Sequence, residues 1–159
     1  MMRVIFREPT ASDLDVLAAH MRPMDALECR LAGRREPREA LEEGVSSASW
    51  VRVAEIDGEV VCCFGLTEVS FLGEEAHPWM LCASGIEKHA RVVLTCAKRF
   101  LAQMQEESER LSNVVHAHNR SAIRFLKWCG FAFGEKMTIK GEPFLEFSWS
   151  REAKAPAYV

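Results

Sequence analysis

The 159-residue sequence lacks a long hydrophobic run, a paired-cysteine motif and a large excess of charge of one sign. Its longest apolar run, VVCCFGL at 60–66, is far too short for a membrane-spanning helix, which needs about 20 apolar residues. The N-terminal segment MMRVIFREPT contains no hydrophobic core of a signal peptide. The net charge of -3 gives no reason to expect a nucleic acid or an anionic membrane as a partner. These absences predict a soluble cytoplasmic protein.

The six cysteines form neither a CxxC pair nor a zinc-finger spacing. Cys62 and Cys63 are adjacent in a strand-like run, where neighbouring side chains point to opposite faces. The other four lie within apolar patterns, as small buried residues do. We therefore expect free thiols in a reducing, intracellular compartment rather than a disulfide framework.

The length suits one domain, and a hydrophobic content of 48% is sufficient for a globular core. We expect a single domain over residues 1–150 and a loose C-terminal tail at 151–159. No internal repeat and no linker interrupts the first of these ranges.

The N-terminal third predicts one short strand followed by helices. The strand covers 4–6, and Thr10 or Ser12 can cap the first helix. A second helix is expected at about 24–31. The charged stretch 34–44 predicts a short exposed helix that has one apolar edge, at Ala40 and Leu41, and that Gly44 closes.

The remainder of the chain changes to apolar runs that are typical of strands. Runs at 50–56 and 59–66 flank Asp57-Gly58, which is a strong signal for a hairpin. The other expected elements are a strand at 79–82, a long helix from Ile86, a strand at 113–117, a helix from Arg120, and strands at 131–139 and 143–150 joined at Lys140-Gly141. This order predicts an α/β fold with a mixed, twisted sheet of about six to seven strands and helices on both faces.

The segment HNRSAIRFLKWCGF, residues 118–131, has the most specific pattern. Asn119 is a suitable N-cap because its side-chain oxygen can accept a backbone N–H, and Gly130 stands where a left-handed C-terminal cap is wanted. The apolar stripe consists of Ala122, Phe125, Leu126 and Cys129, and the opposite stripe of Arg120, Arg124 and Lys127. Taken alone, these features describe a capped amphipathic helix with a solvated basic face.

The pattern N-x-x-A-x-x-F-x-x-x-x-G-F after a strand resembles motif B of the GNAT superfamily of N-acetyltransferases, and the element order resembles that fold over nearly the whole chain. The resemblance implies an acetyl-coenzyme A site between two splayed parallel strands, here 79–82 and 113–117. It also implies that the pyrophosphate lies at the start of the long helix, where free N–H groups and the helix dipole attract anions. The implied cofactor-binding residues are Leu81, Cys82, Ser84, Gly85, Ile86, Glu87, Lys88, Asn119, Arg120 and Phe125.

Two positions depart from the family pattern. The family loop usually reads R/Q-x-x-G-x-G/A, whereas ASGIEKHA at 83–90 keeps one glycine and places Glu87 near the expected phosphates, with Lys88 and His89 as offsetting charges. The family often has a tyrosine as general acid at the position of Leu126, and the only tyrosine here is Tyr158.

The run N-x-S-x-I-R-F-L-K at 119–127 is also similar to that of short GNAT-like proteins of podophages identified as internal virion proteins. Three functions stay open. The protein could be a phage-encoded enzyme that acetylates a protein lysine, an N-terminus or a small amine. It could be an effector that acetylates one host protein. It could also be a catalytically silent virion or accessory protein that acts by protein contact, and a homodimer is compatible with each.

Amide formation from a thioester needs a positioned amine and a group that removes a proton. His116 and His118 are candidate bases because an imidazole changes charge near neutral pH, and residues two apart on a strand share a face. The alternatives are that they cap a loop, pack beside Trp128, or form an H-x-H metal pair without an evident third ligand. Glu68, which follows the expected central strand, is either a third candidate base or a solvated acid.

Other polar residues have weaker assignments. His77 is expected in a loop with a structural role, and a nucleophilic Cys82 or Cys129 would need a lowered thiol pKa. The basic residues that could meet the cofactor's 3′-phosphate or adenine are Arg120, Arg124 and Lys127, and those that could border the acceptor are Arg34, Arg35 and Arg38.

Overall fold

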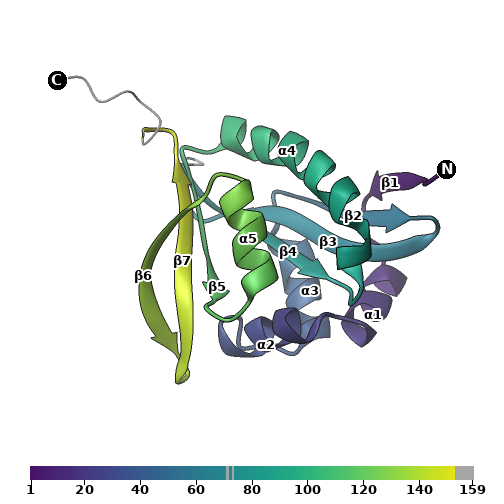
Figure 1. The fold of residues 1–159 in the computed structure, drawn as a ribbon, viewed down its shortest axis with the longest axis horizontal. Coiled ribbons are helices and arrows are strands. Elements are labelled where there is room, and N and C mark those ends of the chain that lie inside the picture. The colour runs from purple at the N-terminus through teal and green to yellow at the C-terminus, as the bar shows by residue number, and fades with distance from the viewer. Residues whose placement is uncertain (71, 73, 153–159) are drawn as a thin grey trace. The chain divides into compact units, whose positions relative to one another are not determined.

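In the computed structural model, which describes residues 1–70, 72 and 74–152, seven strands form a mixed sheet in the order β1-β2-β3-β4-β5-β7-β6 (Figure 1). The elements along the chain are β1 (Val4–Arg7), α1 (Ala11–Ala19), α2 (Pro23–Leu31), α3 (Pro37–Ser47), β2 (Trp50–Ile56), β3 (Glu59–Glu68), β4 (Glu75–Cys82), the 3₁₀ turn η1 (Ile86–His89), α4 (Ala90–Glu107), β5 (Arg110–His116), α5 (Arg120–Trp128), β6 (Ala132–Ile139) and β7 (Glu142–Ser150). The predicted α/β class and strand number are confirmed. No helix among the described residues combines the length and apolarity needed to cross a membrane.

The chain divides into two compact units. Unit 1 comprises Met1–Thr67 and Trp79–Ala90, and unit 2 comprises Glu68–Pro78 and Arg91–Val159. The single domain expected over 1–150 stays a prediction. All six cysteines are free thiols.

In unit 1, helices α1, α2 and α3 pack against one face of the β2–β3 hairpin. The cluster that joins them includes Leu17 and Leu41 from the helices, and Val53 and Cys63 from the strands, all buried. The hairpin turn at Asp57-Gly58 has φ values of 47° and 84°, the left-handed conformation that Asp-Gly favours in a tight hairpin turn. The predicted hairpin is confirmed.

The predicted end of α3 at Gly44 is wrong, because the helix continues to Ser47. The predicted apolar edge is confirmed: Leu41 is completely buried and Ala40 packs on the same cluster. Gly44 is explained instead by a contact distant in sequence. A Cβ at Gly44 would lie 3.0 Å from the indole ring of Trp79, and one at Gly65 would lie 3.1 Å from it. Both glycines therefore make room for one tryptophan, and Gly44 does not act as a helix stop.

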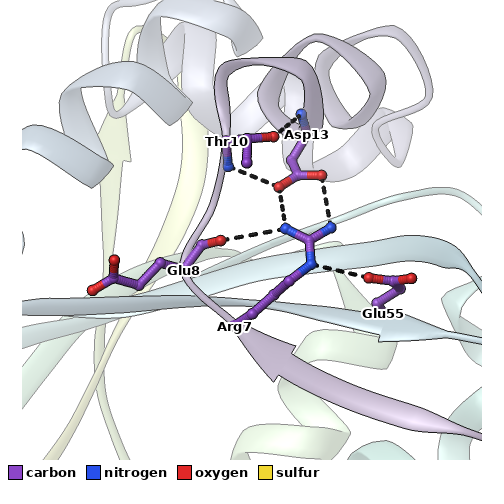
Figure 2. Close-up of polar contacts among 5 residues, drawn as sticks. All are labelled: Arg7, Glu8, Thr10, Asp13 and Glu55. Carbon is purple, nitrogen blue, oxygen red and sulfur yellow. Dashed lines mark hydrogen bonds and ion pairs between the residues drawn. The ribbon is translucent and has the colours of Figure 1, made fainter.

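A charged network joins β1, α1 and β2 (Figure 2). The Arg7 guanidinium donates to both carboxylate oxygens of Asp13, at 2.6 and 3.0 Å, and to Glu55 at 3.0 Å. Asp13 also accepts the backbone N–H of Thr10, whose hydroxyl accepts the N–H of Asp13 in return. Thr10 is thus the N-cap of α1 in a reciprocal capping box.

Unit 2 contains β5, β7, β6 and α5. β7 pairs antiparallel with β5 from Arg110–Ser150 to His116–Phe144, and with β6 on its other side (Figure 1). Lys140 and Gly141, with φ values of 49° and 83°, form the predicted β6–β7 turn. The buried side chains of β7 are Phe144, Phe147 and Trp149, and a register shift between Phe133 and Lys136 interrupts the β6–β7 pairing.

Gly130 ends α5 as predicted. It has φ of 95°, its N–H donates to the Lys127 carbonyl at 3.0 Å, and the N–H of Phe131 donates to the Leu126 carbonyl at 3.1 Å. These two bonds define a Schellman motif.

The bounds of β4 and of the long helix differ from expectation, and so does the position of Arg151. β4 begins at Glu75, so His77 and Pro78 lie in a strand and not in a loop. The long helix starts as the 3₁₀ turn η1, and its regular part runs from Ala90 to Glu107. Arg151, expected in a loose tail, bonds the Glu109 carboxylate and the Gln105 carbonyl. Residues 153–159 of that tail, including Tyr158, lie outside the described residues.

Candidate functional site

The turn that follows β4 in unit 1 brings together the predicted pyrophosphate residues 84–88. Gly85 has φ of 88°, a left-handed conformation that suits glycine. The N–H of Ser84 donates to the His20 carbonyl at 2.7 Å, and those of Ile86 and Lys88 are bonded within the turn. Among the described residues, the N–H groups of Gly85 and Glu87 have no backbone acceptor. These two amides are the ones that an anion could use.

Beneath this turn lies a set of charges that the sequence did not predict. Arg22 Nη1 contacts Asp25 Oδ1 at 2.6 Å, and Arg22 Nε contacts Glu87 Oε1 at 3.2 Å. The other oxygen of Asp25 accepts the N–H of Cys82 at 2.8 Å, and the Cys82 carbonyl accepts the N–H of Arg22 at 2.9 Å. Burial raises the pKa of Asp25, against the opposing effects of Arg22 and the Cys82 amide. Glu87 is therefore paired with Arg22. The sequence had pointed only to Lys88 and His89 as residues that offset the charge of Glu87.

The last residues of β4 and the residue after it pack and form hydrogen bonds within unit 1. Leu81 packs on the cluster under α1–α3, Cys82 is buried, and the N–H of Ala83 donates to the Val61 carbonyl. A hydrogen bond with Cys62, together with burial, raises the pKa of the Cys82 thiol well above its usual range. Cys82 is thus a poor nucleophile.

In unit 2, the backbone ladder between β4 and β5 contains only two residue pairs, Glu75–Arg110 and Ala76–Leu111. At the next residues, side chains and not backbone groups make the hydrogen bonds between the two strands. His77 Nδ1 lies 2.6 Å from the Ser112 carbonyl oxygen.

The side chain of Asn113 bonds two further backbone groups of these strands. Its Nδ2 donates to the Pro78 carbonyl at 3.0 Å, and its Oδ1 accepts the N–H of Val114 at 2.8 Å. Asn113 therefore makes the bonds that a continued ladder would have made.

His116 and His118 do not occupy alternate positions of one strand, because β5 ends at His116 and the chain then turns. The expectation that they share a strand face is wrong for this reason. His116 is buried, its Nδ1 accepts the backbone N–H of His118 at 3.0 Å, and its Nε2 lies 3.2 Å from Glu142 Oε1. This geometry places the proton of a neutral imidazole on Nε2. The His118 side chain is exposed.

Asn119 stands at the N-cap of α5, but its side chain makes no capping hydrogen bond, and that part of the prediction is wrong. It is nearly fully buried, and its own N–H donates to the His116 carbonyl at 3.0 Å. Phe125 is half-buried and Arg120 is exposed.

The remaining candidates lie on the surfaces of the two units. Glu68 is exposed at the end of β3. Arg38 forms ion pairs with Asp15 at 2.7 Å and Glu42 at 3.2 Å within unit 1.

The structure also bears on Cys129 as a nucleophile and on the alternative of an H-x-H metal pair. Burial raises the pKa of the Cys129 thiol to about 11, so that it too is a poor nucleophile. Among the described residues, no three His, Cys, Asp or Glu side chains form a group that could hold a metal ion.

Comparison with known proteins identifies the fold. Neither a protein-family model nor a curated protein matches the sequence. Among solved structures, the chain is similar to aminoglycoside acetyltransferase AAC(6′)-Ib in complex with coenzyme A, with a TM-score of 0.66, 16% identity, and 95% and 96% of the two chains covered. It is similar to spermidine N-acetyltransferase from Vibrio cholerae in complex with coenzyme A and spermine, with a TM-score of 0.63, 16% identity, and 94% and 96% covered.

A third match is an uncharacterized protein from Bacillus halodurans, with a TM-score of 0.68, 13% identity, and 95% and 86% covered. The protein thus has the fold of the GNAT N-acetyltransferases over nearly its whole length. The resemblance to podophage internal virion proteins gains no support from these matches.

Proposed function

We propose that the protein is an acetyl-coenzyme A-dependent N-acetyltransferase. The observation that carries the proposal is the turn after β4, where Gly85 is left-handed and where, among the described residues, the N–H groups of Gly85 and Glu87 have no backbone acceptor. Backbone N–H groups in such a turn are suited to phosphate oxygens. The similarity to acetyltransferases solved with coenzyme A supports the same cofactor.

The proposed residues fall into two sets, one in each unit. In unit 1, Ser84, Gly85, Ile86, Glu87 and Lys88 form the phosphate turn, with Leu81 and Cys82 as the strand residues that precede it. In unit 2, the proposed cofactor-binding residues are Asn119, Arg120 and Phe125, which the motif B pattern includes.

Acetyl-coenzyme A supplies a thioester whose carbonyl carbon is open to attack by an amine. The amine nitrogen forms a bond to that carbon, the carbon–sulfur bond breaks, and the thiolate leaves and takes a proton. The amine's proton must pass to a base. We assign this role to His118, whose imidazole is exposed, with Glu68 as the competing candidate. His116 then positions His118 through the hydrogen bond to its backbone N–H, since both nitrogens of His116 are already engaged.

The test is release of free coenzyme A thiol from acetyl-coenzyme A with three classes of amine. These are spermidine, an aminoglycoside, and peptides that carry a lysine or a free N-terminus. We expect one class to accelerate thiol release at least tenfold over the rate without amine, as directed chemistry at a bound thioester would. No acceleration by any class would contradict turnover with these acceptors.

A glycine pair tests the placement of the phosphate turn. Gly85→Val should abolish acetyl-coenzyme A binding while circular dichroism shows a folded protein. Gly58→Val is the matched control because Gly58 has φ of 84° and a Cβ there would meet nothing within 4 Å, so that it carries the same backbone strain away from the turn. Equal affinities of the two variants for acetyl-coenzyme A would contradict the placement of the phosphate at this turn.

The alternative is a catalytically silent phage virion or accessory protein. It is favoured by one observation, the presence of Leu126 where the family often has a tyrosine acid. It predicts that the protein copurifies with particles and binds no acetyl-coenzyme A. Micromolar binding would count against it.

A further inference from the structure

Arg22 is held between two carboxylates that differ in their freedom to move. The Asp25 side chain is 6% exposed, and its second oxygen is fixed by the Cys82 amide. The Glu87 side chain is 58% exposed, and it contacts Arg22 at the longer distance of 3.2 Å. The Arg22 side chain itself is 14% exposed. Asp25 is therefore a permanent counter-ion of Arg22, and Glu87 is an exchangeable one.

The consequence for an incoming anion follows from the chemistry of the groups. An exposed ion pair adds little stability, because water and salt compete for both charges. A guanidinium binds phosphate at least as well as carboxylate, since its planar fork can donate two parallel hydrogen bonds. The Asp25 contact also orients the guanidinium in advance, so that little side-chain freedom is lost when a ligand binds.

We propose that Arg22 is a phosphate ligand of the turn after β4, and that Glu87 is an internal anion that the phosphate displaces. The inference rests on the proposed function and adds a residue from the α1–α2 connection to the binding site. It also gives Glu87 a role. In the absence of cofactor Glu87 neutralises Arg22, and it lowers the affinity for any anion that must take its place.

Calorimetric titration with acetyl-coenzyme A tests this exchange. Glu87→Gln removes the competing charge, and we expect the Kd to fall by about twofold to fivefold, the range that corresponds to an exposed ion pair. The matched control is Glu36→Gln, because Glu36 is 65% exposed, contacts Arg30 Nε at 3.0 Å and also lies in unit 1. This control should leave the Kd unchanged.

The converse change is made at Arg22. Arg22→Gln should raise the Kd roughly tenfold or more, as expected when one partner of a desolvated charge pair is truncated. Because this variant leaves Asp25 buried without its cation, Arg22→Lys is measured beside it. Lysine retains the charge and loses the fork, and an intermediate Kd is expected.

Equal Kd values for wild type, Glu87→Gln and Glu36→Gln would overturn the inference while leaving the proposed function intact. A weaker Glu87→Gln complex would overturn it as well, since Glu87 would then assist binding. A folded wild-type protein that binds no acetyl-coenzyme A would instead contradict the proposed function, and the inference would fall with it.

Discussion

The Arg7–Asp13–Glu55 network gives unit 1 a measurable dependence of stability on pH (Figure 2). The bidentate bond from Arg7, with the Thr10 bonds in support and burial in opposition, lowers the pKa of Asp13 from 3.8 to about 2. The difference between the two pKa values corresponds to about 2 kcal/mol, since one pKa unit is worth about 1.4 kcal/mol. Asp13 is buried, so this figure needs no large reduction for solvent screening.

The sign follows from the lowered pKa. Above about pH 4, the carboxylate is ionised in both the folded and the unfolded chain, and its full contribution is present. As the pH falls from about 4 to about 2, the unfolded chain takes up the proton first, so that the free energy of unfolding decreases. The contribution is lost below about pH 2.

The assay is urea-induced unfolding of wild type and Asp13→Asn from about pH 7 to about pH 2. We expect wild type to be more stable by about 2 kcal/mol at neutral pH, and the difference to shrink toward zero at the acid end. Asp15→Asn is the control, because Asp15 is 70% exposed in its pair with Arg38 and should lose at most about 1 kcal/mol. A difference between wild type and Asp13→Asn that stays constant over this pH range would refute the reasoning, since the ionised carboxylate would not be its source.

Two further predictions concern packing and the end of the β4–β5 ladder. Gly65→Ala should lower the free energy of unfolding by about 1–3 kcal/mol, because its Cβ would lie 2.7 Å from a backbone oxygen and 3.1 Å from the Trp79 ring; an unchanged Tm would contradict this. Asn113→Ala should cost about 1–3 kcal/mol, because the Val114 N–H and the Pro78 carbonyl lose their partner. Hydrogen exchange should then show faster exchange of the Val114 amide, and equal protection in wild type and variant would show that Asn113 is dispensable there.

Features with a local cause could be predicted from the sequence. Asp57-Gly58 and Lys140-Gly141 sit in turns whose positive φ values these residue pairs tolerate, and the left-handed cap at Gly130 follows from the same property. The apolar periods on either side of these turns then determined the order of strands and helices.

Features that depend on distant contacts could not be predicted. Gly44 has the sequence context of a helix stop, but α3 continues through it, and the distant Trp79 ring explains why this position has no side chain. The pairing of Arg22 with Glu87 joins positions 65 residues apart, since 87 − 22 = 65. The i,i+3 spacing of Arg22 and Asp25 at the start of a helix could have indicated their ion pair. Nothing comparable in the sequence connects Arg22 with Glu87.

The surroundings of His116 could not be predicted for a related reason. His116 was expected to be available, but the turn after β5 brings the His118 amide onto its Nδ1, and Glu142 lies at its Nε2. The expected strand at 113–117 implied that side chains would alternate between the two faces of the sheet beyond His116. The chain turns at that point instead, since β5 ends at His116.

The central claim is that the turn after β4 binds acetyl-coenzyme A, and calorimetric titration of the wild-type protein tests it most directly. Desulfo-coenzyme A and ATP serve as controls, the first for the contribution of the sulfur and the second for a nucleotide without the pantetheine arm. We expect micromolar binding of acetyl-coenzyme A that ATP does not reproduce. The absence of heat in a protein that circular dichroism shows to be folded would contradict it.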